Sequence, residues 1–349
     1  MNKDGLMVID VHRHCLPKPS AGIKGVARFI LEKRIGWKET PDYAITKCKG
    51  ISSIVYPELI DIDAQIRRQD EAGIGTGILS FSMALETMVT ALPVVSEQKL
   101  TRRLNDATAA MVNRYPGKLS FLAIINPFAK HAVPECERCL DHLGAKGVNI
   151  STSWKGHFLD SPQLDSFWQF IEDRNVAVFL HPPQVPIGHQ HMGVYKLEEM
   201  VGRPFDTTMS VIRMIYAGVF DRHPRLKVVL PHMGAFVPMI DGRLDFGYRL
   251  GYKGLPDGQA PACQKRPSEY IHTNLYVDTM GFSPKSVKHA LDLFGSDRVL
   301  FGSDYAAVPI SPKEQVEMIR GLGLSREGEE KVLWKNTARL FGIGDPQAG

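Results

Sequence analysis

The sequence predicts an α/β fold, a (β/α)8 barrel of the TIM type that forms a single domain over residues 1–349. Short and nearly continuous hydrophobic runs alternate with helical stretches, as in parallel strands that are buried on both faces. There are eight such runs, the number of strands in a closed barrel. No G-x-G-x-x-G follows the first run, which argues against a dinucleotide-binding sheet.

The predicted strands lie at 6–11, 77–82, 119–126, 147–152, 176–182, 226–232, 274–279 and 298–304. Helical periodicity is found at 61–72, 97–115, 161–174, 207–222 and 284–295. The last of these begins with SPKS, a serine N-cap followed by proline at the first helical position.

Three connections are too long to be tight turns: residues 15–60, 184–206 and 249–273. They follow the first, fifth and sixth predicted strands. Active sites of barrel enzymes are built at the carboxyl ends of the strands. We therefore expect these segments to be lid insertions.

The composition is that of an ordinary soluble enzyme, with 44% hydrophobic and 23% charged residues. A net charge of +4, spread without runs, does not indicate binding to nucleic acid or to a membrane surface. No apolar stretch approaches the roughly 18–20 residues of a membrane span, and the N-terminus lacks the features of a signal peptide. Five cysteines form no disulfide framework. We expect a cytoplasmic protein that acts on a small molecule.

Polar residues follow the first hydrophobic run in the stretch VIDVHRHCLP, residues 8–17. Residues i and i+2 of a strand point to the same side. We therefore expect Asp10, His12 and His14 to share one face, with Val11 and Arg13 on the other.

Other predicted strands end in the same way. His181 ends the fifth in FLHPP, His232 ends the sixth in VLPHMG, and Asp304 ends the eighth in FGSDY. These ends meet at one mouth of a barrel, so the residues become neighbours. Imidazole nitrogen and carboxylate oxygen together suit a borderline divalent ion, zinc first, with manganese or iron as alternatives. We predict one ion, with the ligands His12, His14, His181 and Asp304, and expect Asp10 to orient a ligand or the barrel floor.

These motifs resemble the metal-dependent amidohydrolase superfamily. Residues 202–234 resemble more narrowly the branch named for aminocarboxymuconate semialdehyde decarboxylase, which also holds aromatic-acid decarboxylases, a hydratase and hydrolases. The resemblance implies a mononuclear zinc or manganese site with the four ligands above, and His232 beside the metal, acting on substrate or water. Binuclear relatives carry a lysine at the end of strand four, where this chain has VNISTSW. Its absence favours one metal.

The resemblance leaves the reaction open. We predict non-oxidative decarboxylation of an aromatic or unsaturated carboxylic acid, with Asp304 and His232 as the proton shuttle. The alternative is hydrolysis of an amide, a lactone or another C–N or C–O bond by metal-bound water. Many aromatic-acid decarboxylases of the branch have glutamate in place of the first histidine, whereas this chain has both histidines. A hydratase, a binuclear-metal oxygenase and a non-catalytic ligand-binding barrel are further alternatives.

Residues of the insertions are the candidates for binding substrate. Arg203 or Arg249 would hold a carboxylate by paired hydrogen bonds, with Tyr195, His189 and His191 as further candidates. The two histidines, in IGHQHMG, would also supply a second metal site if the enzyme were an oxygenase. Strand parity turns Arg13 away from the barrel interior, so it is expected to pack on the first helix or on a neighbouring subunit. By analogy with barrel relatives, we expect a homodimer.

Overall fold

The computed structural model describes residues 7–16, 37–39, 44–48, 51–81, 85, 89, 96–252, 255–256 and 258–344. Its parallel strands are β1 (Ile9–Cys15), β5 (Thr76–Phe81), β6 (Leu119–Phe121), β7 (Ala123–Ile125), β8 (Val148–Ser151), β11 (Ala177–His181), β12 (Lys227–Leu230), β13 (Leu275–Asp278) and β14 (Val299–Leu300). The helices are α2 (Ile62–Ala72), α4 (Glu97–Val112), α5 (Ala132–His142), α6 (Asp165–Asp173), α7 (Arg203–Tyr216), α8 (Val219–Arg222), α9 (Val237–Leu250), α10 (Pro267–Thr273), α11 (Pro284–Phe294), α12 (Pro312–Arg320), α13 (Arg326–Glu330) and α14 (Asn336–Phe341).

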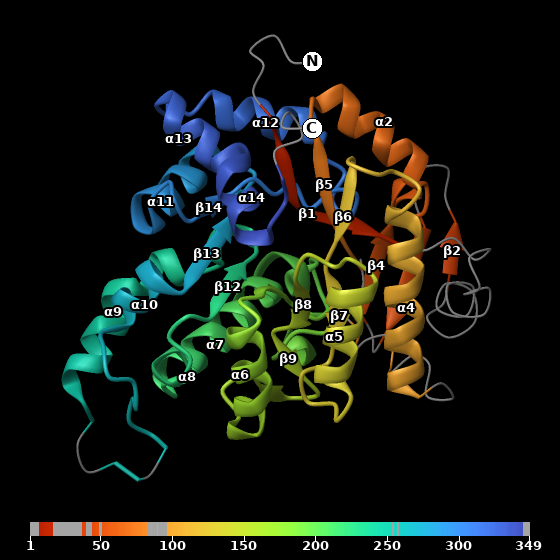
Figure 1. The fold of residues 1–349 in the computed structure, drawn as a ribbon. Coiled ribbons are helices and arrows are strands. Elements are labelled where there is room, and N and C mark those ends of the chain that lie inside the picture. Colours follow the sequence, from red (N-terminus) through yellow and green to blue (C-terminus); the bar gives the residue numbers. More distant parts are fainter. Residues whose placement is uncertain are drawn as a thin grey trace.

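The parallel strands form two sheets, with the orders β1-β5-β6 and β14-β13-β12-β11-β8-β7. The sheets meet at Leu122, which separates β6 from β7. They meet again where Val11 N donates to Phe301 O at 2.9 Å and Asp304 N donates to His12 O at 2.7 Å. The helices surround the strands (Figure 1). The predicted α/β class is confirmed. A single closed barrel is not recorded among the described strands.

Two hydrophobic layers hold the strands. Val178 and Leu180 of β11 belong to the large cluster that the strands share with the helices around them. Phe179, between them, packs in a second cluster with residues of strands across the sheets, among them Val11 and Val229. Each strand is therefore apolar on both faces, which explains the continuous hydrophobic runs of the sequence.

The predicted insertions contain short elements. Residues 15–60 include an antiparallel sheet of β2 (Trp37–Glu39), β3 (Ala44–Cys48) and β4 (Ile51–Val55), and part of this insertion lies outside the described residues. Residues 184–206 include the turns η4 (His189–His191) and η5 (Glu198–Gly202). Their action as lids stays a prediction. None of the helices among the described residues is long and apolar enough to cross a membrane.

A β-bulge in β1 corrects the predicted side-chain alternation. Asp10 pairs with Gly77 of β5, but Arg13 pairs with Leu79, so one extra residue lies on β1 between these pairs. A Cβ built on Gly77 would lie 2.7 Å from Arg13 Cδ. The Arg13 side chain therefore lies on the face of the sheet to which a side chain at position 77 would point. Asp10 lies on that side too, 3.9 Å from Arg13 Nε. Asp10 therefore does not share a face with His12 and His14.

Candidate metal centre

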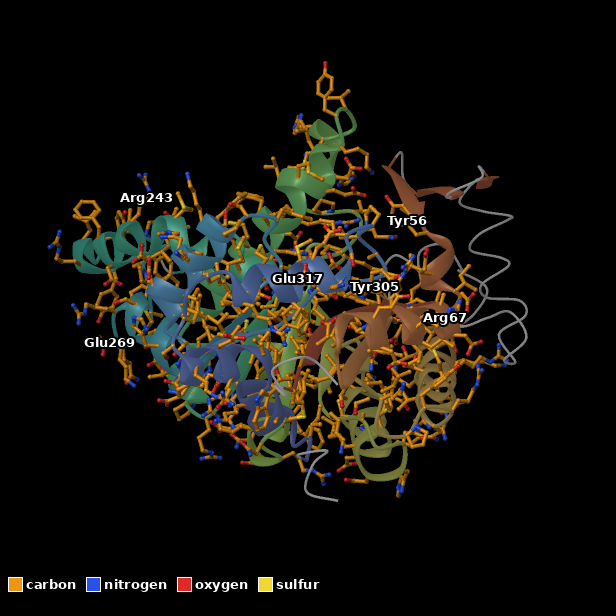
Figure 2. The ribbon with its side chains drawn as sticks, turned by 90° about the horizontal axis from the view of Figure 1, so that it is seen from above. Tyr56, Arg67, Arg243, Glu269, Tyr305 and Glu317 are labelled. Atoms are coloured by element: carbon orange, nitrogen blue, oxygen red, sulfur yellow. The ribbon has the colours of Figure 1, made fainter. Side chains whose placement is uncertain are left out.

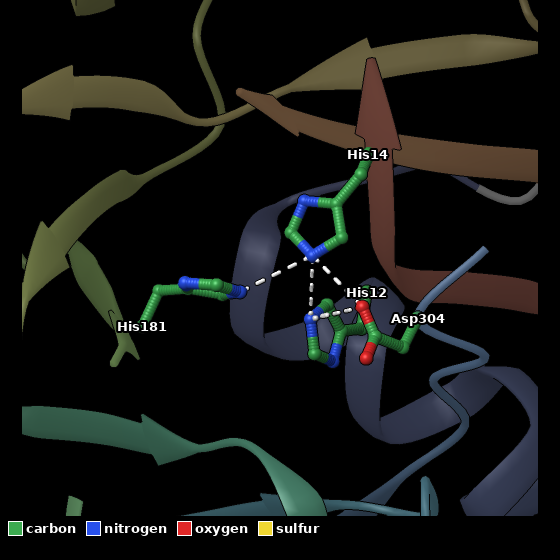
Figure 3. Close-up of side chains that lie close together, drawn as sticks. All are labelled: His12, His14, His181 and Asp304. Carbon is green, nitrogen blue, oxygen red and sulfur yellow. Dashed lines mark hydrogen bonds and ion pairs between the residues drawn. The ribbon is translucent and has the colours of Figure 1, made fainter. Parts of the chain in front are cut away.

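The structure brings the four predicted ligands together. One ligand atom from each of His12, His14, His181 and Asp304 lies within 4.8 Å of the others, and all four side chains are buried or nearly so. His14 Nε2 lies 3.0 Å from His12 Nε2, 3.2 Å from His181 Nε2 and 2.9 Å from Asp304 Oδ1. Figure 3 shows the three rings and the carboxylate turned toward one point.

Strand ends and one strained turn position these residues. His12 and His14 lie on β1 beyond the bulge, and His181 is the last residue of β11. Asp304 follows β14 with a φ of 56°, in the left-handed region that aspartate tolerates better than most residues. The turn depends on Gly302, where a Cβ would lie 2.9 Å from His12 Cβ and from Asp278 Cβ. Only glycine fits at that distance.

The partners of the Nδ1 atoms fix the protonation of all three rings. His181 Nδ1 lies 3.0 Å from Pro182 O, and His12 Nδ1 lies 2.6 Å from Asp278 Oδ2; both oxygens can only accept, as long as the aspartate is ionised. Ser80 Oγ donates to the Arg13 carbonyl at 3.3 Å and lies 3.1 Å from His14 Nδ1, from which it accepts.

Each Nδ1 therefore carries a proton, and each Nε2 turns a lone pair to the same point. Three lone pairs and a carboxylate oxygen at these distances repel one another unless a cation lies among them. The residues present therefore fit a divalent metal.

For His14, His181 and Asp304, burial and mutual charge together favour the same protonation states. Burial lowers the pKa of His14, and burial with the neighbouring rings holds the pKa of His181 well below its usual range. Burial would raise the pKa of Asp304, but the His12 and His14 rings outweigh it and hold that pKa well below its usual range. Neutral imidazoles and an ionised carboxylate are the forms that bind a metal.

His12 differs from the other two rings. Burial lowers its pKa, but the carboxylates of Asp304 and Asp278 outweigh burial, so the pKa of His12 is raised. This ring lies between two carboxylates, with Asp304 Oδ1 at 3.4 Å from its Nε2.

His232 lies beside the cluster without joining it. It begins the turn η6 (His232–Gly234), and its Nε2 is 3.7 Å from Asp304 Oδ2, the oxygen that is not turned to the ligands. Its Nδ1 is buried and has no hydrogen-bond partner among the described residues. This arrangement allows His232 to exchange a proton with a molecule bound at the cluster.

Sequence reasoning missed Asp278 and Ser80. Asp278 is the last residue of β13, so the signal that identified the histidines, a polar residue at a strand end, was also present there. Ser80 lies on β5 opposite His14 in the register, and nothing local distinguishes it from a packed serine.

Among the predicted substrate residues, Arg203 lies at the end of the molecule that holds the cluster. It begins α7, whose Asp206 accepts from Thr152 Oγ1, and Thr152 N donates to His181 O at 3.1 Å. The Arg203 side chain pairs with Glu199 at 3.7 Å, and its buried Nε has no hydrogen-bond partner in the described part of the chain.

The structure does not bring Arg249 to the cluster. This residue lies near the carboxyl end of α9, with its guanidinium 5.5 Å from the Phe246 ring centre. It lines a surface pocket of about 310 Å³ with Gly242, Asp245, Phe246, Tyr248 and Arg266. Figure 2 shows Arg243 of the same helix at the outer edge of the molecule, far from Tyr305, the residue after Asp304. The sequence could not reveal that α9 leads away from the site.

The three candidates after β11 lie outside the cluster. Tyr195 is 88% exposed, with a φ of 56°. His191 is exposed and His189 is partly buried, and neither belongs to the group of four ligands found among the described residues. A second metal site at these histidines therefore has no support in the described geometry.

Asp10 and Arg13 form a buried network behind the cluster. Asp10 accepts from Ser303 N at 3.0 Å and from Ser303 Oγ at 2.6 Å, which fixes the residue before Asp304. Arg13 is fully buried, donates to Gln65 and Gln69 of α2, and does not reach the cluster. The predicted packing of Arg13 on the first helix is confirmed. The sequence predicts that Asp10 orients a ligand imidazole or the barrel floor. It instead accepts from the backbone N–H of His12 at 3.2 Å and, through Ser303, orients the Asp304 turn.

Several known proteins are similar to this chain in sequence and in fold. A family model described as an amidohydrolase matches residues 9–343. The 2-amino-3-carboxymuconate-6-semialdehyde decarboxylase of Dictyostelium discoideum is 28% identical, over 97% of this chain and 92% of its own. The gamma-resorcylate decarboxylase of Rhizobium radiobacter is 31% identical, over 81% of this chain and 88% of its own. A solved structure of 5-carboxyvanillate decarboxylase from Novosphingobium aromaticivorans, complexed with manganese and 4-hydroxy-3-methoxy-5-nitrobenzoic acid, has a TM-score of 0.79 at 20% identity and covers 98% of each chain.

Proposed function

The chain belongs to the amidohydrolase family, and we propose from this that it is a metal-dependent, non-oxidative decarboxylase of an aromatic or unsaturated carboxylic acid. The observation that carries the proposal is the convergence of three imidazole lone pairs and the Asp304 carboxylate, with His232 Nε2 3.7 Å from the free oxygen of that carboxylate. The curated relatives above are decarboxylases by name, which favours this reaction over hydrolysis, hydration or oxygenation.

A divalent ion is the cofactor, and we propose zinc first, with manganese or iron as alternatives. His12, His14, His181 and Asp304 would hold it. When bound, the ion supplies a positive charge for the substrate carboxylate and a neighbouring oxygen. Manganese is the ion named with the carboxyvanillate enzyme.

The residues of this chain supply the proton. Loss of carbon dioxide breaks the bond between the carboxyl group and the substrate carbon, and the electron pair of that bond stays on the carbon. His232 Nε2 delivers a proton to this carbon, and the Asp304 carboxylate stabilises the protonated ring before transfer. One proton is consumed for each carbon dioxide released, and no oxidant takes part.

The substrate carboxylate needs a cationic partner with a hydrogen-bond donor to spare, and the Nε of Arg203 has no hydrogen-bond partner among the described residues. We propose Arg203, because its pair with Glu199 is long at 3.7 Å and it begins the helix next to the cluster. Tyr195, His189 and His191 would reach substrate only by movement of the segment 184–206. Arg249 lies near the carboxyl end of α9, away from the cluster, so we consider it the weakest of these candidates for binding the substrate.

We further propose a homodimer. Exposed apolar residues gather on α9, where Met239 is 72%, Phe246 49% and Leu250 50% exposed. Such surface is costly to leave in water and is typical of contact surfaces between subunits.

The test is the release of carbon dioxide from 2,6-dihydroxybenzoate, 5-carboxyvanillate and aminocarboxymuconate semialdehyde by protein loaded with zinc or manganese. We expect release under anaerobic conditions. In deuterium oxide, we expect one deuterium in the product, at the carbon that lost the carboxyl group. Release that stops without oxygen would indicate an oxygenase, and cleavage of amides or lactones without carbon dioxide would indicate a hydrolase.

A further inference from the structure

Asp278 contacts two parts of the site at once. It ends β13 and is fully buried. Its Oδ2 lies 2.6 Å from His12 Nδ1. Its Oδ1 accepts from the backbone N–H of Met233 and of Met280, both at 3.1 Å.

The first oxygen decides which nitrogen of His12 faces the metal. The carboxylate accepts the proton of Nδ1, so the lone pair of His12 must lie on Nε2, which faces the other ligands. A carboxylate partner also makes the ring a stronger donor to a metal. Outer partners of this kind are worth 10–100-fold in metal affinity.

The second oxygen holds the turn that carries His232. His232 and Met233 both have left-handed backbone, with φ values of 57° and 58°, a conformation that costs energy and needs support from its surroundings. The His232 Nδ1 has no hydrogen-bond partner among the described residues, and the Nε2 of the ring makes only a long contact of 3.7 Å with Asp304 Oδ2. Asp278 therefore anchors the turn at Met233, the residue next to this histidine, while Ala235 N donates to His232 O at 2.9 Å from the other side.

We propose that Asp278 is a positioning residue that sets the metal-binding tautomer of His12 with one oxygen and the place of His232 with the other. The same carboxylate thereby links metal binding and proton transfer. The inference rests on the proposed metal-dependent decarboxylase.

Asp278→Asn and Asp278→Ala separate the two roles. Asparagine keeps a carbonyl oxygen for the Met233 and Met280 amides, but its NH2 group faces His12 Nδ1 and favours the tautomer with the proton on Nε2. Mn²⁺ affinity, measured from the electron paramagnetic resonance signal of free Mn²⁺, should fall 10–100-fold in Asp278→Asn. Asp206→Asn, which also neutralises a buried carboxylate but touches none of the four ligands, should bind Mn²⁺ like the wild type.

Turnover at saturating Mn²⁺ tests the second oxygen. We expect kcat to be lower in Asp278→Ala than in Asp278→Asn, because only alanine releases the turn of His232. Equal kcat values would overturn this role. Asp278→Asn with wild-type Mn²⁺ affinity would overturn the first role and leave the proposed function standing.

The wild-type protein provides a measurement that does not depend on the folding of a variant. In metal-free protein labelled with [¹⁵N]histidine, at a pH high enough to leave the ring neutral, the NMR signals of His12, assigned with His12→Gln, should show a proton on Nδ1 and none on Nε2. An unprotonated Nδ1 would overturn the tautomer role. A wild-type protein that takes up no Mn²⁺, Zn²⁺ or Fe²⁺ would instead refute the proposed metal centre, and the inference with it.

Discussion

At the scale of single residues, each histidine ligand has a hydrogen-bond partner at its Nδ1 atom, which leaves its Nε2 atom for the metal. Pro182 O, Asp278 and Ser80 hold the three Nδ1 atoms, and they come from three different strands or strand ends. Asp304 turns one oxygen to the ligands and the other to His232. The carboxylate of Asp304 thus contacts the ligand group with one oxygen and the proposed proton donor, His232, with the other.

His181→Ala should abolish metal binding and decarboxylation together, because it removes one of four ligands. Elemental mass spectrometry of the purified variant measures the metal per chain. His272→Ala, at an exposed position of α10, is the matched control and should keep the metal. A normal metal content in His181→Ala would contradict the ligand assignment.

His232→Ala should keep the metal and lower kcat roughly 10²–10⁴-fold, the usual contribution of a general acid or base. The expectation follows from its position outside the group of four ligands. Metal content and steady-state rates of the same preparation decide it. Loss of the metal would show that His232 is itself a ligand.

At the scale of elements, β1 joins the cluster to α2. The bulge sends Arg13 and Asp10 to the helix side and the two histidines to the inner side of the same strand. Arg13 donates to Gln69 and Gln65 of α2, and Asp10 binds Ser303 beside Asp304. Helix, strand and the Asp304 turn therefore form one connected unit.

Arg13→Met should lower the free energy of unfolding by about 3–5 kcal/mol, the cost of leaving a buried charge without its partner. Both Arg13 and Asp10 are fully buried, with Nε and Oδ2 3.9 Å apart. In an Asp10→Asn background the same substitution should cost at least about 1 kcal/mol less, because the pair is already broken. Urea unfolding of the four proteins gives the values, and purely additive losses would show that the two charges do not interact.

Asp206 connects α7 to the segments around the mouth. It accepts from Thr152 Oγ1 and, at 2.8 Å, from the backbone N–H of Ile187. Burial raises the pKa of Asp206, and these hydrogen bonds only partly oppose it. The folded protein therefore holds this proton more tightly than the unfolded chain does.

The sign of the pH dependence follows from this shift. The contribution of Asp206 to stability is fully present below its unfolded pKa and is lost as the pH rises through the higher folded pKa. Asp206→Asn cannot ionise, so the melting temperature of the wild type minus that of the variant should fall as the pH rises from about 4 to about 7. Calorimetry at several pH values measures it, with Asp292→Asn, an exposed site on α11, as control. A difference that grows with pH would contradict the prediction.

At the scale of the whole molecule, the small positive net charge favours one kind of partner, a small anion, and the exposed apolar surface of α9 favours another, a protein. A net charge of +4 is compatible with an anionic small molecule as substrate. Helix α9 lies at the outer edge of the molecule (Figure 1), and its exposed apolar residues are compatible with a second copy of the chain.

The proposed dimer should have twice the 38.9 kDa mass of the chain in light scattering after gel filtration. The double substitution Met239→Glu and Phe246→Glu should shift it to the monomer, because it places charges on the apolar surface of α9. Glu317→Ala, at an exposed site on α12, is the control. A wild-type protein that is monomeric at micromolar concentration would refute the dimer.

The sequence by itself determined the order of strands and helices and most of the site. The hydrophobic runs that end in His12 and His14, in His181 and in Asp304 are local patterns, and the carboxyl ends of neighbouring parallel strands meet wherever such strands form sheets. The four ligands could therefore be predicted before their distances were known. Asp278 ended its run in the same way and could have been found by the same argument.

Only the tertiary structure decided how the site is supported. The side of β1 on which Asp10 lies depends on a bulge, and a bulge is set by pairing with β5, not by the sequence of β1 alone. The partner of His12 is 266 residues away, and Arg249 is separated from the site by the direction of a whole helix. Alternation and periodicity describe the neighbours of a residue along one element. Which elements pack together depends on contacts between distant parts of the chain, and no local pattern contains these contacts.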